Sequence, residues 1–63
     1  MSNVNEYLAD AEVNVKYMDA SINRALNATD EQDAMVESAA AQAYATAALA
    51  FATMAQAAAL RDA

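Results

Sequence analysis

The sequence predicts an all-α protein, an antiparallel hairpin of two helices that assembles into a homo-oligomeric four-helix bundle. Three observations support this fold class. Glycine and proline are both absent, so the chain contains neither the residue most tolerant of a left-handed backbone nor a helix breaker. Alanine, the strongest helix former, makes up about a third of the chain. Apolar residues recur at alternating spacings of three and four, the pattern of helices in a coiled coil.

The first helix is expected over residues 2–27. Its apolar residues form one row with heptad spacing, and polar residues such as Glu12, Lys16 and Asn23 fall outside that row. We therefore expect the row to form this helix's side of the hairpin core. Its members are Val4, Leu8, Ala11, Val15, Met18 and Ile22, followed by Ala25.

A turn is expected over residues 27–30. Asparagine tolerates the left-handed conformation that often ends a helix, so Asn27 is expected to take the place of the missing glycine. Thr29 and Gln32 match a capping box, and the acidic residues that follow suit the first turn of a helix. A single continuous helix is the alternative, because no residue in this segment forbids helix.

The second helix is expected over residues 30–61, and its best heptad row is mostly alanine. Small side chains bury little area but let two backbones approach closely, so the bulky row of the first helix is expected to pack here. The residues predicted to complete the hairpin core are Val36, Ala40, Ala43, Ala47, Ala50 and Met54.

Residues 38–60 contain no charge at all, and large apolar residues lie on several sides of this segment. One neighbouring helix can cover only one side of it. We therefore predict that Tyr44, Leu49, Phe51 and Leu60 form an interface with other copies of the chain or with a larger protein partner.

No catalytic, cofactor-binding or metal-binding residues are predicted. Histidine and cysteine are absent, so the usual general base and thiolate nucleophile are missing, and no glycine is present for a phosphate-binding loop. The acidic residues around Asp33 and Glu37 are interpreted as a solvated helix N-terminus rather than a cation site. Nucleic acid is excluded as a partner, because the net charge is −6 and the three basic residues are scattered.

A membrane span through residues 38–60 is a further alternative. Twenty-three residues of helix reach roughly 34 Å, enough for a hydrocarbon core of about 30 Å. Alanine favours insertion only weakly, however, and the segment has no basic or tryptophan anchors at its N-terminal side. The first residues also lack the pattern of a signal peptide, so we expect a cytoplasmic location.

Two non-enzymatic functions fit these features. The first is a small acidic structural protein that acts through self-assembly and protein–protein contact. The alternative is a small regulator or inhibitor that docks an amphipathic face on a larger host protein. The short, acidic chain also suits a phage-encoded protein, although no motif in it indicates a family.

Overall fold

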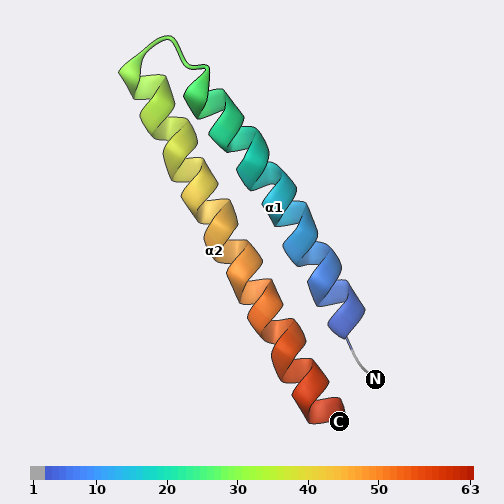
Figure 1. Cartoon of the computed structure of the whole chain (residues 1–63). Helices are drawn as coiled ribbons and strands as arrows, with labels where there is room; N and C mark the ends of the chain where they lie inside the picture. The colour runs from blue at the N-terminus through green and yellow to red at the C-terminus, as the bar shows by residue number, and fades with distance from the viewer. Residues whose placement is uncertain (1–2) are drawn as a thin grey trace.

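A computed structural model of the chain describes residues 3–63 and contains two helices, α1 (Val4–Leu26) and α2 (Glu31–Asp62). The helices lie antiparallel and side by side, so α1 begins at the end of the molecule where α2 finishes (Figure 1). The rod measures 49 × 13 × 11 Å, and its radius of gyration is 14.6 Å, against about 11 Å for a compact chain of this length. The predicted all-α helical hairpin is confirmed, and the continuous helix is excluded.

Helix α1 ends through an asparagine, but not in the predicted conformation. Asn27 has φ −99° and ψ 1°, and no described residue has a positive φ. Its backbone N–H and its side-chain Nδ2 both donate to the carbonyl of Asn23, at 3.1 and 2.8 Å. The side-chain amide thus adds a second hydrogen bond to a carbonyl of the last turn, and the helix ends without a left-handed residue. Residue 2, the predicted start of this helix, lies outside the described residues.

Helix α2 begins with a different cap from the one predicted. Asp30 is the N-cap residue, with an extended backbone, and its Oδ1 accepts a hydrogen bond from the Asp33 N–H at 2.8 Å. The predicted capping box of Thr29 and Gln32 is therefore wrong by one position. Aspartate is at least as good an N-cap as threonine, and its charge also suits the positive end of the helix dipole.

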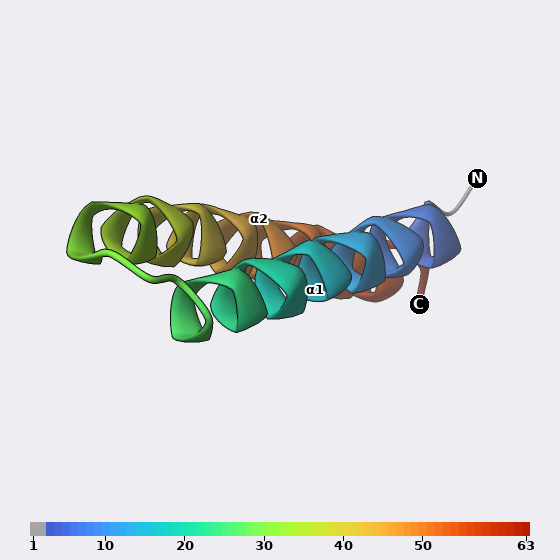
Figure 2. The same cartoon turned by 90° about the horizontal axis from the view of Figure 1, so that it is seen from above.

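Each helix presents one continuous row of buried or half-buried side chains to the other, which we call its contact row. The α1 contact row consists of Val4, Tyr7, Ala11, Asn14, Met18, Ser21 and Ala25. The α2 contact row consists of Ala34, Glu37, Ala41, Tyr44, Ala48, Phe51, Ala55 and Ala58. Both rows alternate spacings of three and four, which suits helices that cross at a shallow angle, as Figure 2 shows.

The contact rows differ from the predicted core in both helices. In α1, Val4, Ala11 and Met18 lie in the row, but Leu8, Val15 and Ile22 are 47, 41 and 40% exposed beside it. In α2, the predicted residues lie to one side of the row. Ala40 and Ala47 are half-buried there, whereas Val36, Ala43, Ala50 and Met54 are exposed.

Side-chain size explains why the rows differ. Tyr44 and Phe51 are the largest side chains in the central part of α2, and burying an aromatic ring gains more than burying an alanine in the same place. Facing these rings, α1 presents residues such as Ala11 and Asn14 rather than its bulky Leu8 and Val15. Large side chains of one helix therefore meet smaller ones of the other.

Two contacts define the register of the hairpin. Arg24 Nε lies 2.9 Å from Glu37 Oε2, and the rings of Tyr17 and Tyr44 have centroids 5.3 Å apart. In both pairs the residue numbers add up to 61. This relation places Tyr7 within one residue of the level of Ala55, near the helix ends where Ala55 and Ala58 are 3 and 1% exposed.

We expect Ala58→Leu to destabilise the hairpin by about 1–3 kcal/mol, because the larger side chain has no space between the helices. Urea unfolding followed by circular dichroism at fixed protein concentration measures this change. Ala57→Leu is the matched control, since Ala57 is exposed and its replacement is expected to change stability by no more than about 0.5 kcal/mol. Equal effects of the two changes would contradict the contact row described here.

We expect Asp30→Ala to cost about 0.5–2 kcal/mol, because the Asp33 N–H loses its side-chain acceptor. Asp30→Asn provides the control, since asparagine caps a helix about as well as aspartate and should retain most of the stability. The same unfolding experiment applies. A loss of equal size in both variants would mean that the charge, and not the cap, stabilises α2.

A candidate protein interaction surface

The hairpin leaves most of its large apolar side chains exposed. The buried residues of the described chain are three alanines, Ala41, Ala55 and Ala58, together with Ser21. The exposed large apolar residues are Leu8, Val13, Val15, Tyr17, Ile22, Leu26, Met35, Val36, Leu49, Met54 and Leu60. Such a quantity of exposed apolar surface on a small protein is typical of an interaction site.

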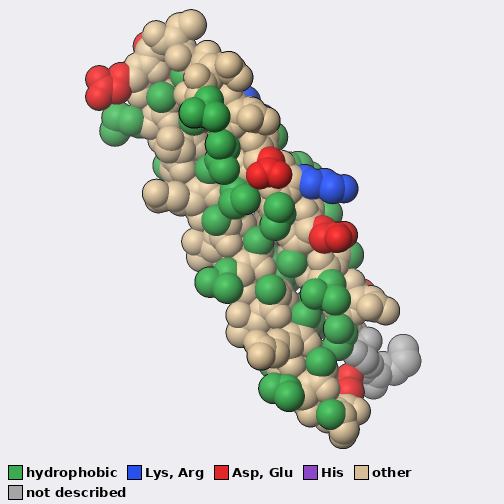
Figure 3. Space-filling view, in the orientation of Figure 1, with side chains coloured by type: hydrophobic (Ala, Val, Ile, Leu, Met, Phe, Trp, Pro, Cys, Tyr) green, Lys and Arg blue, Asp and Glu red, His purple; other side chains and the backbone are tan. Residues whose placement is uncertain are grey.

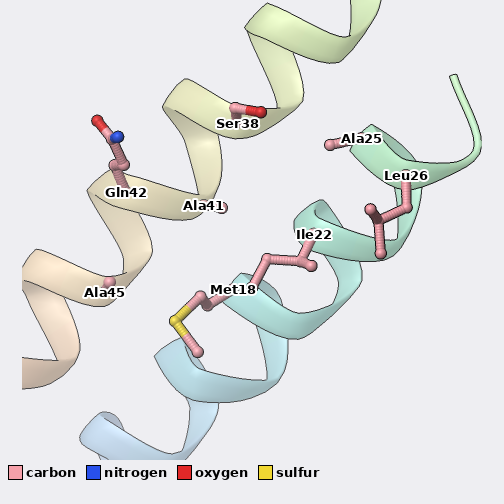
Figure 4. A pocket seen from close by; sticks show the side chains of 8 residues that line it. All are labelled: Met18, Ile22, Ala25, Leu26, Ser38, Ala41, Gln42 and Ala45. Atoms are coloured by element: carbon pink, nitrogen blue, oxygen red, sulfur yellow. The ribbon is translucent and has the colours of Figure 1, made fainter.

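One side of the hairpin carries an apolar groove between the helices. Figure 4 shows side chains of α1 and α2 on its two walls near the turn. The groove has a volume of about 370 Å³ and is lined by Met18, Ile22, Ala25, Leu26, Ser38, Ala41, Gln42 and Ala45. A second hollow, of about 530 Å³, lies further along α1 and is lined by Leu8, Ala11, Glu12, Val15 and Lys16.

These residues belong to a longer surface, because positions seven apart on a helix share a side. Val15 and Leu8 precede Ile22 by one and two heptads, and Leu49 and Ala52 follow Gln42 and Ala45. We call this surface the groove face. Its members are Leu8, Val15, Ile22 and Leu26 of α1 and Met35, Ser38, Gln42, Ala45, Leu49 and Ala52 of α2.

Charge surrounds the apolar surface unevenly. In the view of Figure 3, hydrophobic side chains run along the whole hairpin, while charged side chains lie mainly along the margin of α1 and near the turn. The α1 margin next to the groove face carries Glu12, Lys16 and Asp19, and α2 has no charge from residue 38 to residue 60. An apolar centre with a polar margin is the usual composition of a protein interface.

The opposite side of the hairpin has polar contacts between its own helices. Arg24 Nε pairs with Glu37 Oε2, and Arg24 Nη2 donates to the buried Ser21 Oγ at 3.0 Å. The tilted Tyr17 and Tyr44 rings lie on the same side. We call this surface the ion-pair face. It bears the exposed residues Val36 and Met54, but its arginine and carboxylate already have partners within the chain.

The four residues predicted as an interface do not lie together. Tyr44 and Phe51 are half-buried in the α2 contact row, with the Tyr44 ring against Tyr17 of α1. Leu49 and Leu60 are 68 and 72% exposed. Leu49 belongs to the groove face, whereas Leu60 shares a heptad position with Thr46 and Thr53 on the outer side of α2. The sequence pattern did not reveal the groove face, because it assigned Leu8, Val15 and Ile22 to the hairpin core. The α2 residues of this face were not grouped with them.

Two acidic residues near the turn have partners within the chain. The carboxylate of Asp30 caps α2, and that of Glu37 pairs with Arg24. Across residues 3–63, no three side chains of the metal-binding types lie close enough together to hold an ion.

We expect Phe51→Ala to destabilise the hairpin by about 2 kcal/mol, roughly half of the 3–5 kcal/mol that a fully buried phenylalanine contributes. The reason is its half-buried place in the α2 contact row. Leu60→Ala is the control, because this exposed residue is expected to change stability by less than about 0.5 kcal/mol. If unfolding by urea showed no loss for Phe51→Ala, the ring would not belong to the contact row.

Comparison with known proteins gives no relative from which a function follows. No family model matches the chain, and no curated protein or solved structure matches it either.

Proposed function

We propose that this protein is a non-enzymatic, acidic helical protein that acts through self-assembly and protein–protein contact, in a structural or assembly role. The main support for the proposal is that the hairpin buries few and small side chains but exposes many large apolar ones. Three alanines and one serine are buried among the described residues, while eleven large apolar side chains are exposed. Burial of apolar surface is the main favourable term in folding, and this hairpin alone obtains little of it.

The accessible surface supports the same proposal. The chain exposes 4635 Å², whereas a compact monomer of 6.6 kDa is expected to expose about 3,900 Å². The excess arises because two helices form one layer, and a single layer leaves both of its broad sides in water. A second layer would cover one of these sides.

Docking on a different, larger protein is the runner-up to self-assembly, and it uses the same exposed surface. The charge distribution does not exclude it, because the apolar surface is broad and the acidic groups are confined mainly to α1 and the turn. Self-assembly is preferred since it requires no component beyond this chain.

A membrane-spanning role is the second alternative, and α2 provides the observation that favours it. Within the described residues, α2 is the one helix long and apolar enough to cross a bilayer, with a mean hydropathy of 1.3 over its best window. Thr46 and Thr53 donate their hydroxyls to the carbonyls four residues before them, both at 2.9 Å. These bonds satisfy the hydroxyls without water, as is common for threonines in membrane helices.

Light scattering behind a sizing column, in buffer without detergent, tests the proposal. We expect a defined mass that is a multiple of 6.6 kDa, and dissociation on dilution. A helical monomer at every concentration would overturn self-assembly and make an outside protein the better candidate. Protein that stays in solution only with detergent, and that floats with lipid vesicles, would instead support the membrane alternative.

A further inference from the structure

We propose that the groove face is occupied by the groove face of a second copy of this chain, with both turns at the same end of a four-helix bundle. In this dimer α1 of each chain packs against α2 of the other. The inference rests on the proposed self-assembly and adds its surface and its geometry. Four observations support it: the interface area, the charge distribution, the register of the hairpin, and the hydrogen bonds already formed within the chain on the opposite face.

The area matches one interface of ordinary size. Each chain exposes about 700 Å² more than a compact monomer of its mass, so two chains together expose roughly 1,500 Å² in excess. A stable protein interface buries about 1,200–2,000 Å² in total. Covering one broad side of each hairpin therefore accounts for the whole excess.

Two arrangements with twofold symmetry bring groove face against groove face. A twofold axis parallel to the helices places α1 opposite α2 of the partner, with the turns together. A perpendicular axis places α1 opposite α1, with the turns at opposite ends. In the second arrangement, the antiparallel α1 helices bring the two charged margins together, with Glu12 near the partner's Asp19. Each margin has two carboxylates and only Lys16 to offset them, so like charges predominate, and like charges at an interface are costly. The first arrangement places these carboxylates beside the uncharged flank of α2.

The hairpin register then pairs the two flanks in detail. Rotation about a twofold axis parallel to the helices does not change the position of a residue along that axis. Residues of the two chains whose numbers add up to 61 therefore lie at the same position along the bundle. Three large residues of α1 then lie opposite three small residues of the partner's α2, each within one residue of the same level. The pairs are Leu8 with the partner's Ala52, Val15 with the partner's Ala45, and Ile22 with the partner's Ser38. Large side chains thus meet small ones at three successive heptads, which is the condition for close packing.

The outer row of the same interface contains three pairs, of which two match in chemical character. By the same relation, Leu26 comes level with the partner's Met35, which pairs the two most exposed apolar residues near the turn, 78 and 65% exposed. Asp19 comes level with the partner's Gln42, whose amide can donate to a carboxylate. Glu12 comes level with the partner's Leu49, a pair that offers a direct test.

The ion-pair face is the weaker candidate for the same role. Its side chains Arg24, Glu37 and Ser21 are already joined by hydrogen bonds within the chain. Covering that face would take the ion pair out of water, where desolvation offsets the attraction between the charges. The groove face requires no such loss at its centre.

Charge substitution at Leu49 tests the pairing. Leu49→Glu places a second carboxylate opposite the partner's Glu12, and we expect the dimer dissociation constant to rise about tenfold or more. Leu49→Lys places an ammonium group there, and we expect it to retain the dimer much better than Leu49→Glu. Val36→Glu adds the same charge to the ion-pair face and is the control expected to leave the dimer intact. The readout is the mass by light scattering across a dilution series, with circular dichroism confirming that each variant is helical.

A spin label on Thr29→Cys, the sole cysteine in that variant, reports the direction of the two chains. We expect two labels within about 20 Å, since neighbouring helices are 8–10 Å apart. Labels separated by about the 49 Å length of the rod would overturn the shared turn end. Equal dissociation by Leu49→Glu and Leu49→Lys would overturn the pairing with Glu12. Two results would refute the groove face as the dimer interface but leave self-assembly supported. One is a trimer, and the other is a dimer that is lost in Val36→Glu and retained in Leu49→Glu. A monomeric wild type would refute both.

Discussion

The close approach of two helices across small side chains is the constraint on which this structure depends. Among residues 3–63, the buried residues are Ser21 in α1 and Ala41, Ala55 and Ala58 in α2, and none of them has more than two heavy atoms beyond Cα. The larger residues of the contact rows, such as Phe51, are accommodated because smaller residues such as Ala11 stand opposite them. The stabilisation from such a contact is mainly dispersion between backbones, since alanine contributes little transfer free energy. The hairpin therefore has a defined geometry but little buried area.

That geometry makes the two broad sides of the hairpin unequal. The contact row of α1 is turned so that Arg24 and Tyr17 lie on one side and Leu8, Val15 and Ile22 on the other. Polar contacts between the helices join the first side, while the second is an open apolar groove near the turn. Had α1 packed through its bulkiest row, the hairpin would have buried those residues itself. The choice of contact row thus creates the candidate interaction surface.

The helical hairpin could be predicted from the sequence, because composition and periodicity both depend on local preferences. The absence of glycine and proline, the abundance of alanine and the polar segment before Asp30 were sufficient. Which row faces which helix could not be predicted, since several rows in residues 38–60 are equally uncharged. Periodicity identifies a helix well but distinguishes poorly between neighbouring apolar rows. The aromatic residues were the available signal, because burying Tyr44 or Phe51 gains more free energy than burying an alanine in the same place. They were assigned to the outer interface instead. The cap at Asp30 was missed for a similar reason, as two adjacent residues had nearly equal preferences.

The connection between the helices has a consequence for how the chain associates. Four residues, 27–30, join α1 to α2, so the contact between the helices is intramolecular and has an effective concentration in the millimolar range. No residue of this connection needs a positive φ, and its backbone conformations are open to ordinary residues. Two chains opened at this point and laid side by side would form the same α1–α2 contacts between different molecules. The closed hairpin therefore prevails over this exchanged pair through the shortness of its connection, and its advantage declines as the concentration of the protein approaches that effective value.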